Sequence, residues 1–254
     1  YYLGQYYEQK NEFDDALKAY RDLISHFRLG DSQWVDDVQN RVKDITSPQL
    51  NVSTGYTFLP DSDIQFSLNW RNIGSAQAAL YRIDLTKELQ FNQFKSETDS
   101  NRGINSYSEL IKGIVDSKRY LSYQAAKTWQ ITLKDDEDYQ WHDASKGLAE
   151  WQKKDDKEEV DPQKGKLEAG AYLLLISSKG VQAYELILVT DMGLVTKTAG
   201  QTALFFSFDS KTGAPRPKVN VKYHYQYYTY QGNLIWDEGQ GVTLVGIKGE
   251  GSEF

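Results

Sequence analysis

The sequence predicts a mainly β protein, in which antiparallel β-sandwich modules follow a short α-helical front segment. Apolar residues recur at helical spacing as far as Ile45, and after Pro48 the period changes from about 3.6 to 2. Turn-forming clusters such as Asn72-Ile73-Gly74 and Ser178-Lys179-Gly180 separate the later runs, as in antiparallel sheets. Because 254 residues exceed the usual size of one domain, we expect two or three modules.

Residues 1–47 are expected to form three helices. Gly30-Asp31-Ser32 separates the second helix from the third and offers an N-cap, and Ser47-Pro48 ends the third. The positions with helical spacing are Leu3, Tyr7, Phe13, Ala16, Leu17, Tyr20, Leu23, Ile24, Phe27, Trp34, Val38, Val42 and Ile45. We expect this segment to dock through Trp34, Val38 and Val42, either on the sandwich or on further helices.

Strands are predicted where apolar and polar residues alternate, or where an apolar run has the length of a strand. These stretches are 64–70, 81–85, 129–133, 172–176, 184–189, 203–208 and 219–225. Further turns are expected at 209–213 and at Gly239-Gln240-Gly241. We therefore expect residues 48–191 to form a first sandwich, and 192–250 a second, truncated one.

Residues of about 89–166 are polar and charged, and are predicted to be a helical and loop insertion in the first sandwich. A capping box at Ser106 to Glu109 opens a helix that carries Leu110, Ile114 and Leu121 on one side. The stretch 153–166 has almost no apolar residue and is predicted to be a mobile loop. Residues 251–254, Gly-Ser-Glu-Phe, are typical of a cloning scar.

Composition argues against several classes of function. The net charge of −7 is spread along the chain, so no basic footprint for nucleic acid exists. No run approaches the ~20 apolar residues of a membrane span, so we expect no membrane insertion. Cysteine is absent, which excludes disulfides and thiolate metal sites within this chain.

Catalytic and metal-binding patterns are also missing from the sequence. His26, His142 and His224 are scattered, with no His-Glu-x-x-His spacing, and no Gly-x-Ser-x-Gly motif occurs. The acidic run 135–138 lacks the spacing and the glycine of a calcium loop, and is interpreted as a solvated turn. We expect no catalytic residues, no metal and no cofactor, and hence not an enzyme.

A cluster of tyrosines near the C-terminus offers candidate contacts with a partner. Tyr223 and Tyr225 continue the parity of the preceding valines, so they are predicted to face the core. Tyr228 and Tyr230 have the opposite parity, and together with Trp34 they are the candidate partner-contact residues. The alternative, that the tyrosine row serves cross-strand packing, remains open.

The front segment resembles the tetratricopeptide repeat. Leu3-Gly4, Tyr7, Ala16, Tyr20 and Leu23 lie at the offsets of that pattern, while Arg28 replaces its usual terminal proline. The resemblance covers one repeat. Because such units need roughly three stacked copies or another body to lean on, it implies further repeats before Tyr1.

The remainder resembles macroglobulin-type domains of bacterial α2-macroglobulins. For residues 51–191 the resemblance is carried by Pro60 before the stretch 63–72, by the runs 80–85 and 167–172, and by Thr128-Trp129. From 188 onward the chain resembles the start of a second such domain, with the run 209–215 among its opening features. The chain departs from the family's sequence pattern around Pro60. It also departs at Gly170, a position at which the family often has proline.

This resemblance implies a function for a larger parent protein. Bacterial α2-macroglobulins are large periplasmic proteins that trap proteases broadly, and some members use a cysteine-derived thioester. The expected partners are therefore proteases, bound through the full-length protein, and other domains of the same chain. The alternative is a cell-envelope module that binds a protein or a glycan, and an enzyme ranks third.

Overall fold

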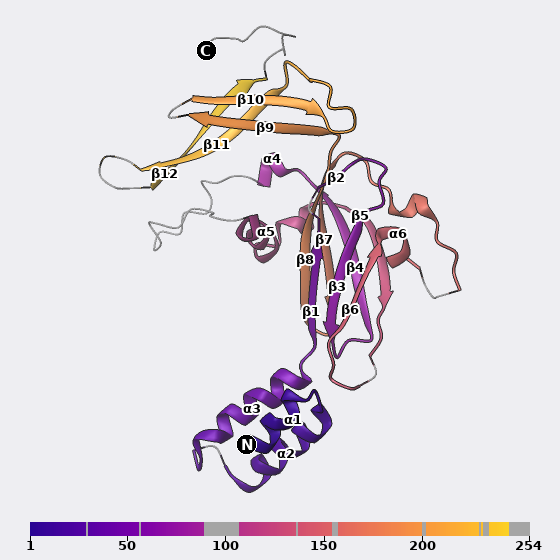
Figure 1. Cartoon of the computed structure of the whole chain (residues 1–254), viewed down its shortest axis with the longest axis vertical. Helices are drawn as coiled ribbons and strands as arrows, with labels where there is room; N and C mark the ends of the chain where they lie inside the picture. Colours follow the sequence, from indigo (N-terminus) through magenta and orange to yellow (C-terminus); the bar gives the residue numbers. More distant parts are fainter. Residues whose placement is uncertain are drawn as a thin grey trace.

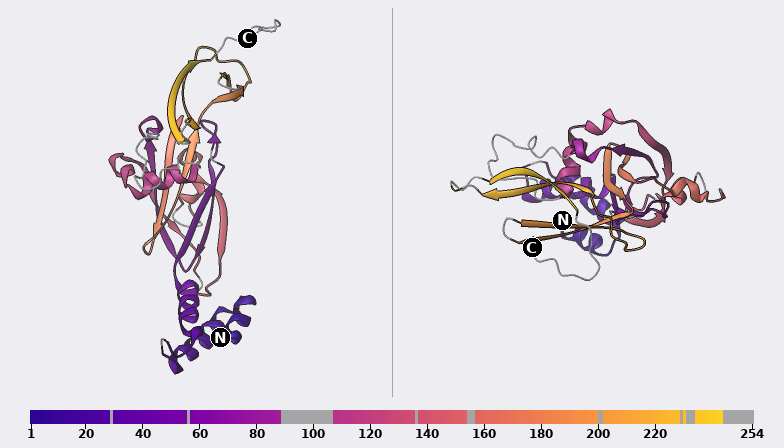
Figure 2. Two further views of the ribbon diagram at one scale, coloured as in Figure 1. Left: turned by 90° about the vertical axis from the view of Figure 1, so that its left-hand side faces the viewer. Right: turned by 90° about the horizontal axis from the view of Figure 1, so that it is seen from above.

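The computed structural model describes residues 1–28, 30–55, 57–88, 107–135, 137–153, 157–199, 202–228, 230 and 234–243. Three bodies follow one another along the long axis: helices at one end, a β-sandwich in the middle and two β-hairpins at the other end (Figures 1 and 2). The fold class is as predicted, a mainly β protein with helices at its N-terminus. The helices end at Thr46 and the first strand begins at Gln49, while the last strand of the sandwich ends at Val189 and the first hairpin begins at Met192. The division into domains stays a prediction.

The front segment consists of α1 (Tyr2–Gln9), α2 (Phe13–His26) and α3 (Gln33–Thr46). Ser32 caps α3, since its side chain accepts a hydrogen bond from the amide of Trp34. Helices α1 and α2 lie so close at Gly4 that a Cβ there would be 2.2 Å from Cε1 of Tyr20, which is fully buried. Only glycine fits at this helix crossing. The resemblance of the segment to the tetratricopeptide repeat stays a prediction.

The sandwich packs a three-stranded sheet against a five-stranded one. The first contains β1 (Gln49–Thr54), β3 (Gln65–Arg71) and β6 (His142–Gly147), in the order β1-β3-β6. The second has the order β2-β8-β7-β4-β5, made of β2 (Thr57–Phe58), β8 (Val181–Val189), β7 (Gly170–Ser178), β4 (Ser75–Ile83) and β5 (Ala125–Thr132). All pairs in these two sheets are antiparallel except β2 with β8.

Strand β7 is buried on both faces, which explains its unbroken apolar sequence. Leu174 and its same-face neighbours pack into the core between the sheets, whereas Leu173 points the other way. The second face is covered by α5 (Tyr107–Asp116) and the 3-10 helix η2 (Arg119–Ser122). Ile114 is buried there as predicted, but Leu121 is exposed, and the side chains of Ser106 and Leu110 lie outside the described residues.

The predicted insertion at about 89–166 contains two strands of the sandwich, β5 and β6. Strand β6 has the sequence His-Asp-Ala-Ser-Lys-Gly. The sequence pattern does not predict it, because an edge strand needs few apolar residues. It is followed by α6 (Leu148–Trp151) and η3 (Pro162–Gly165). Within the stretch predicted to be mobile, Asp161 caps η3 and Gly165 is buried, so that part is anchored.

The last body consists of two antiparallel hairpins, β9 (Met192–Ala199) with β10 (Thr202–Asp209) and β11 (Asn220–Tyr228) with β12 (Leu234–Val242). The predicted turn at 239–241 is wrong, because these residues lie inside β12. Gly239 pairs with Tyr223, and a Cβ there would lie 2.4 Å from Cζ of that ring. Tyr223 also packs against Phe205, with ring centroids 5.0 Å apart, so it faces inward as predicted.

Helix α4 (Leu85–Glu88) follows β4. Among the helices that the structure describes, none has both the length and the apolar character needed to cross a bilayer.

Candidate interaction sites at the two junctions

Polar side chains gather at the two places where one body joins the next. The helical junction comprises Asn11, Phe13, Arg71, Asn72, Tyr139 and Gln140, and it joins the helices to the sandwich. The arginine corner comprises Asp191, Asp209 and Arg216, and it lies where the hairpins begin, directly after the sandwich. Both are built around an arginine that contacts residues distant in the sequence.

Arg71, the last residue of β3, lies at the centre of the helical junction and is only 8% exposed. Its Nε donates a hydrogen bond of 2.6 Å to the carbonyl of Tyr139, and its guanidinium lies 4.4 Å from the ring centroid of Phe13. Nη2 is buried and has no hydrogen-bond partner within the described part of the chain. Burial lowers the pKa of Arg71, because the charged form loses hydration.

The neighbouring residue ties the end of α3 to the sandwich. Asn72 has a left-handed backbone (φ 58°), and its Nδ2 donates to the carbonyls of Ile45 (2.7 Å) and Ser47 (2.9 Å). Such a bond satisfies a carbonyl that the end of a helix leaves without a partner. Gln140 adds a bond from Nε2 to the carbonyl of Asn11, at 2.6 Å.

Docking of the helices on the sandwich therefore uses residues other than Trp34, Val38 and Val42, and docking of these residues on further helices stays a prediction. Val38 is fully buried inside the helical core and Val42 packs against that core. Trp34 stacks on Tyr1, with ring centroids 4.4 Å apart. All three serve the packing of the helices on one another, whereas Tyr139 from the sandwich reaches the helical core.

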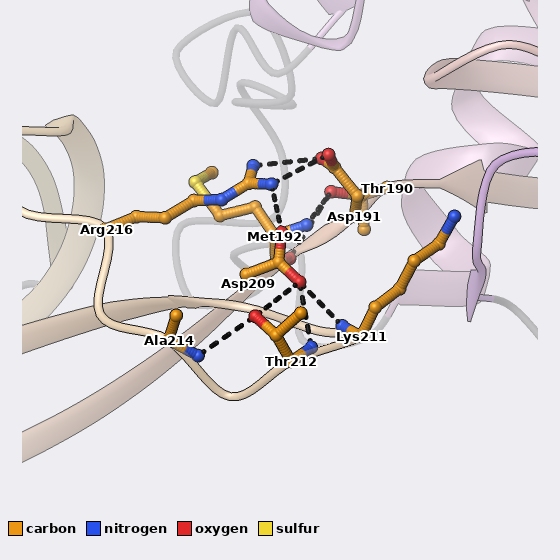
Figure 3. Close-up of polar contacts among 8 residues, drawn as sticks. All are labelled: Thr190, Asp191, Met192, Asp209, Lys211, Thr212, Ala214 and Arg216. Carbon is orange, nitrogen blue, oxygen red and sulfur yellow. Dashed lines mark hydrogen bonds and ion pairs between the residues drawn. The ribbon is translucent and has the colours of Figure 1, made fainter.

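At the arginine corner, one guanidinium joins two carboxylates (Figure 3). Nη1 and Nη2 of Arg216 donate to Oδ1 and Oδ2 of Asp191 at 3.1 and 2.8 Å, a bidentate pair. Nη2 also donates to Oδ2 of Asp209. Asp191 lies between β8 and β9, so the pair fixes the start of β9 to the segment between β10 and β11.

The second oxygen of Asp209 organises the turn after β10. Oδ1 accepts hydrogen bonds from the amides of Thr212 (2.9 Å) and Lys211 (3.0 Å) and from the Thr212 hydroxyl (3.1 Å). These bonds, with the ion pair to Arg216, lower the pKa of Asp209 to about 2. The pKa of Asp191 is likewise lowered, chiefly by its bond to Arg216. Both carboxylates are therefore ionised and engaged at neutral pH, which suits a structural tie.

The two histidines whose side chains the structure describes, His26 and His142, lie on different bodies. His26 is exposed on α2, and His142 stacks on Trp70 at 5.7 Å with its Nε2 3.5 Å from Asp138. The side chain of His224, like Asp136 of the acidic run, lies outside the described residues. Over the part of the chain that the structure describes, no group of three His, Cys, Asp or Glu residues is arranged to hold a metal ion.

Two of the three predicted partner-contact residues, Trp34 and Tyr230, lie in different bodies of the molecule. Trp34 is half-buried beside Tyr1 and Tyr2 in the helical body. Tyr230 is fully exposed in the connection between β11 and β12. The side chain of Tyr228 lies outside the described residues.

Sequence reasoning did not identify Arg71 or Arg216. A usable signal existed for the second, because the turn 209–213 was recognised and an aspartate that opens such a turn is a ready partner for a nearby arginine. For Arg71 the only signal was its place before a predicted turn. Its partner Tyr139 is 68 residues away.

Comparison with family models and with curated proteins finds no match. Among solved structures, the chain is similar to native alpha-2-macroglobulin from Escherichia coli spanning domains MG0-NIE-MG1, at 13% identity and a TM-score of 0.42. This match covers 77% of the present chain and 58% of that chain, so the present chain spans somewhat over half of it.

A structure of the same E. coli protein spanning NIE-MG1 is 12% identical, with a TM-score of 0.42, and the match covers 78% of this chain and 84% of that chain. Salmonella alpha-2-macroglobulin reacted with methylamine is 10% identical, with a TM-score of 0.27 and coverage of 79% and 14%. Similarities at these identities and TM-scores do not bear on activity.

Proposed function

We propose that this chain is a non-catalytic structural and interaction segment of a large α2-macroglobulin-like protein. The observation that carries the proposal is the arrangement of three bodies in series, with one polar cluster around Arg71 between the helices and the sandwich and another around Arg216 where the hairpins begin. Such clusters make the chain a stiff arm that holds its two ends at a set separation. The whole protein would be a broad-spectrum endopeptidase inhibitor, with its proteases as partners.

The motifs behind the family resemblance support this proposal, because they coincide with the sandwich itself. The stretch 63–72 contains β3, the run 80–85 ends β4, and Thr128-Trp129 lies in β5. They are core-forming strands rather than loops, and so they resemble a scaffold and not a site. The proposal puts the chain in the periplasm or cell envelope.

The chemistry of the polar residues also favours a role without catalysis. The carboxylates of the arginine corner have lowered pKa values and fixed partners, whereas a general acid or base needs a pKa near the working pH. The buried guanidinium of Arg71 faces a ring and a carbonyl rather than a cleft. What these groups do is hold segments together.

Stiffness is tested by the distance between two spin labels, one on each end body. The chain has no cysteine, so Asp15→Cys on α2 and Thr196→Cys on β9, both exposed, take the labels specifically. We expect a narrow distance distribution that broadens when Arg71→Ala and Arg216→Ala are added. The control is Arg82→Ala, which removes an exposed ion pair between two residues of the sandwich body. This variant should leave the distance distribution narrow. A broad distribution in the parent chain would refute the stiff arm.

The lack of catalysis and of trapping by this segment alone is tested with proteases of different specificity. Each protease is incubated with the purified chain, and cleavage of a large protein substrate is followed. We expect no loss of cleavage. Stoichiometric loss, with the chain nicked once and the protease retained, would contradict the proposal.

One observation favours the second candidate, a cell-envelope binding module. Helix α1 exposes Tyr2, Leu3 and Tyr6, with 69%, 58% and 50% of each residue accessible. Aromatic residues on a surface are suited to grip a protein or to stack on sugar rings. Co-sedimentation with purified cell-wall sacculi that is lost in Tyr2→Ser/Tyr6→Ser would favour this candidate over the first.

A further inference from the structure

The two long sides of the sandwich differ. On one side β1 contacts β8 across the two sheets, and this side is closed. On the other side the outermost strands are β6 of the small sheet and β5 of the large sheet, each paired with a single neighbour among the described strands. Between them runs the edge groove, about 480 Å³ in volume and lined by Trp70, Ile131, Thr132, Leu133, Lys134, Ala144, Lys146, Glu150, Trp151 and Lys153.

The groove exists because β6 has short or polar residues on its inward face. In the pairing of β3 with β6, Leu68 lies opposite Ala144, and Phe66 lies opposite Lys146. Directly paired residues share a face, so Ala144 and Lys146 point toward the interior beside large apolar side chains. Packed sheets lie about 10 Å apart, and an alanine is too short to fill that space at the edge.

The lining is apolar at its base and positively charged at its rim. The indole N–H groups of Trp70 and Trp151 donate to the carbonyls of Lys134 (2.7 Å) and Phe66 (3.1 Å), so their rings contribute apolar surface. Three lysines line the groove against a single glutamate, a net charge of +2 within a chain of net charge −7. Lys146 lies 5.2 Å over the ring of Trp151, with Nζ 3.9 Å from Glu150.

We propose that the edge groove binds an extended peptide segment, which adds to β6 as a further strand. An edge strand offers a row of backbone donors and acceptors to an added strand. Residues of the added strand that face inward would lie beside Ala144 and Lys146, two positions apart. The position of the added strand beside Ala144 suits an apolar side chain, which fills the gap. The position beside Lys146 suits an acidic side chain, which pairs with the lysine.

The competing interpretation is that Lys146 keeps the edge free. An inward-pointing charge on an edge strand is a common protection against unwanted pairing. The two interpretations predict opposite effects of neutralising the lysine. Removing a protective charge strengthens strand addition and self-association, whereas removing a recognition charge weakens the binding of an acidic segment.

The test uses an acetylated, amidated octapeptide with the sequence Thr-Val-Thr-Glu twice over, and a counterpart with lysine in place of glutamate. Amide chemical shifts of the whole chain are followed by NMR during titration. We expect the acidic peptide to shift the amides of Ala144, Lys146 and Ile131, and the lysine peptide to bind at least about 5-fold more weakly. Lys146→Gln should raise the Kd of the acidic peptide about 5-fold, the size of a solvent-accessible ion pair.

A matched pair of variants locates the binding. Ala144→Leu fills the groove and should abolish binding, whereas Ser145→Leu places the same side chain on the exposed face of the same strand and should change the Kd less than about 2-fold. Equal binding of the two peptides, tighter binding by Lys146→Gln, or binding retained in Ala144→Leu would each overturn the proposal. Because Lys146→Gln leaves the core unchanged, it decides the matter even if Ala144→Leu fails to fold. The inference needs only the sandwich, so it is independent of the proposed function.

Discussion

The contact between Arg71 and Phe13 should determine how firmly the helices are held on the sandwich. Arg71→Ala removes a hydrogen bond from a charged donor, which contributes about 1.5–3 kcal/mol, and a contact with the face of Phe13, which contributes about 0.5–2 kcal/mol. The native structure, however, buries Nη2 of Arg71 without a hydrogen-bond partner among the described residues, which costs about 1–3 kcal/mol. The substitution removes this cost. We expect a net loss of about 2 kcal/mol.

The loss concerns the attachment of one body, so it is measured locally. Hydrogen exchange of residues 2–46 followed by mass spectrometry reports the opening of the helical body, and about 2 kcal/mol corresponds to about 30-fold faster exchange through that opening. Arg82→Ala is the control, since Arg82 also lies near an aromatic ring but is half-exposed within the sandwich. It should leave exchange of the helices unchanged.

A double-mutant cycle isolates the pair. Phe13→Leu keeps an apolar side chain at the junction but removes the ring face, and we expect a coupling free energy of about 1 kcal/mol between it and Arg71→Ala. If the two effects add to within about 0.3 kcal/mol, the ring and the guanidinium do not interact and the reasoning fails. Unchanged exchange in Arg71→Ala alone would show that the helices are held by other contacts.

Three further predictions follow from single positions. Gly4→Ala should destabilise the helical body by about 2 kcal/mol despite the better helix propensity of alanine, because its Cβ would meet the ring of Tyr20; faster exchange of α1 and α2 checks this. Leu173→Ala in β7 should cost about 3 kcal/mol and lower the Tm, whereas Thr128→Ala on the exposed face of β5 should leave it within about 2 °C; equal Tm values would contradict the central place of β7. The pKa of Asp209 is about 2, lowered first by an amide of its own turn and then by Arg216, so its stabilisation is complete above about pH 3.8 and is lost as the pH falls through 2. The protection factors of the β9 and β10 amides, from which the pH dependence of intrinsic exchange is removed, should therefore fall between pH 4 and 2, and Asp209→Asn should abolish that fall.

Local patterns were sufficient for the elements whose burial follows a simple period. The three helices and the cap at Ser32 were predictable, because a helix that packs on one side repeats its apolar residues every 3.6 positions. The unbroken run in β7 was predictable as a strand, though not as the strand covered on both faces. The inward direction of Tyr223 followed from the alternation of its own strand.

Elements that depend on a neighbour were not predictable. Strand β6 has a polar sequence because it lies at an edge, and only its pairing with β3 makes it a strand. The glycines at 239 and 241 indicated a turn, but in β12 the absence of a side chain at Gly239 makes room for the ring of Tyr223. The sequence does not distinguish a glycine that allows a turn from a glycine that leaves space for a neighbouring side chain.

The sequence by itself determined the order of the elements, helices first and strands after, because the period of apolar residues is a property of consecutive positions. Only the tertiary structure decided the candidate sites. Arg71 meets Tyr139 across 68 positions, Arg216 meets Asp191 across 25, and the edge groove needs strands from both sheets. A pattern of neighbouring residues cannot predict contacts over such separations in sequence. A charged side chain pairs with a group that lies close in space, and the packing of the sheets and helices determines which groups lie close.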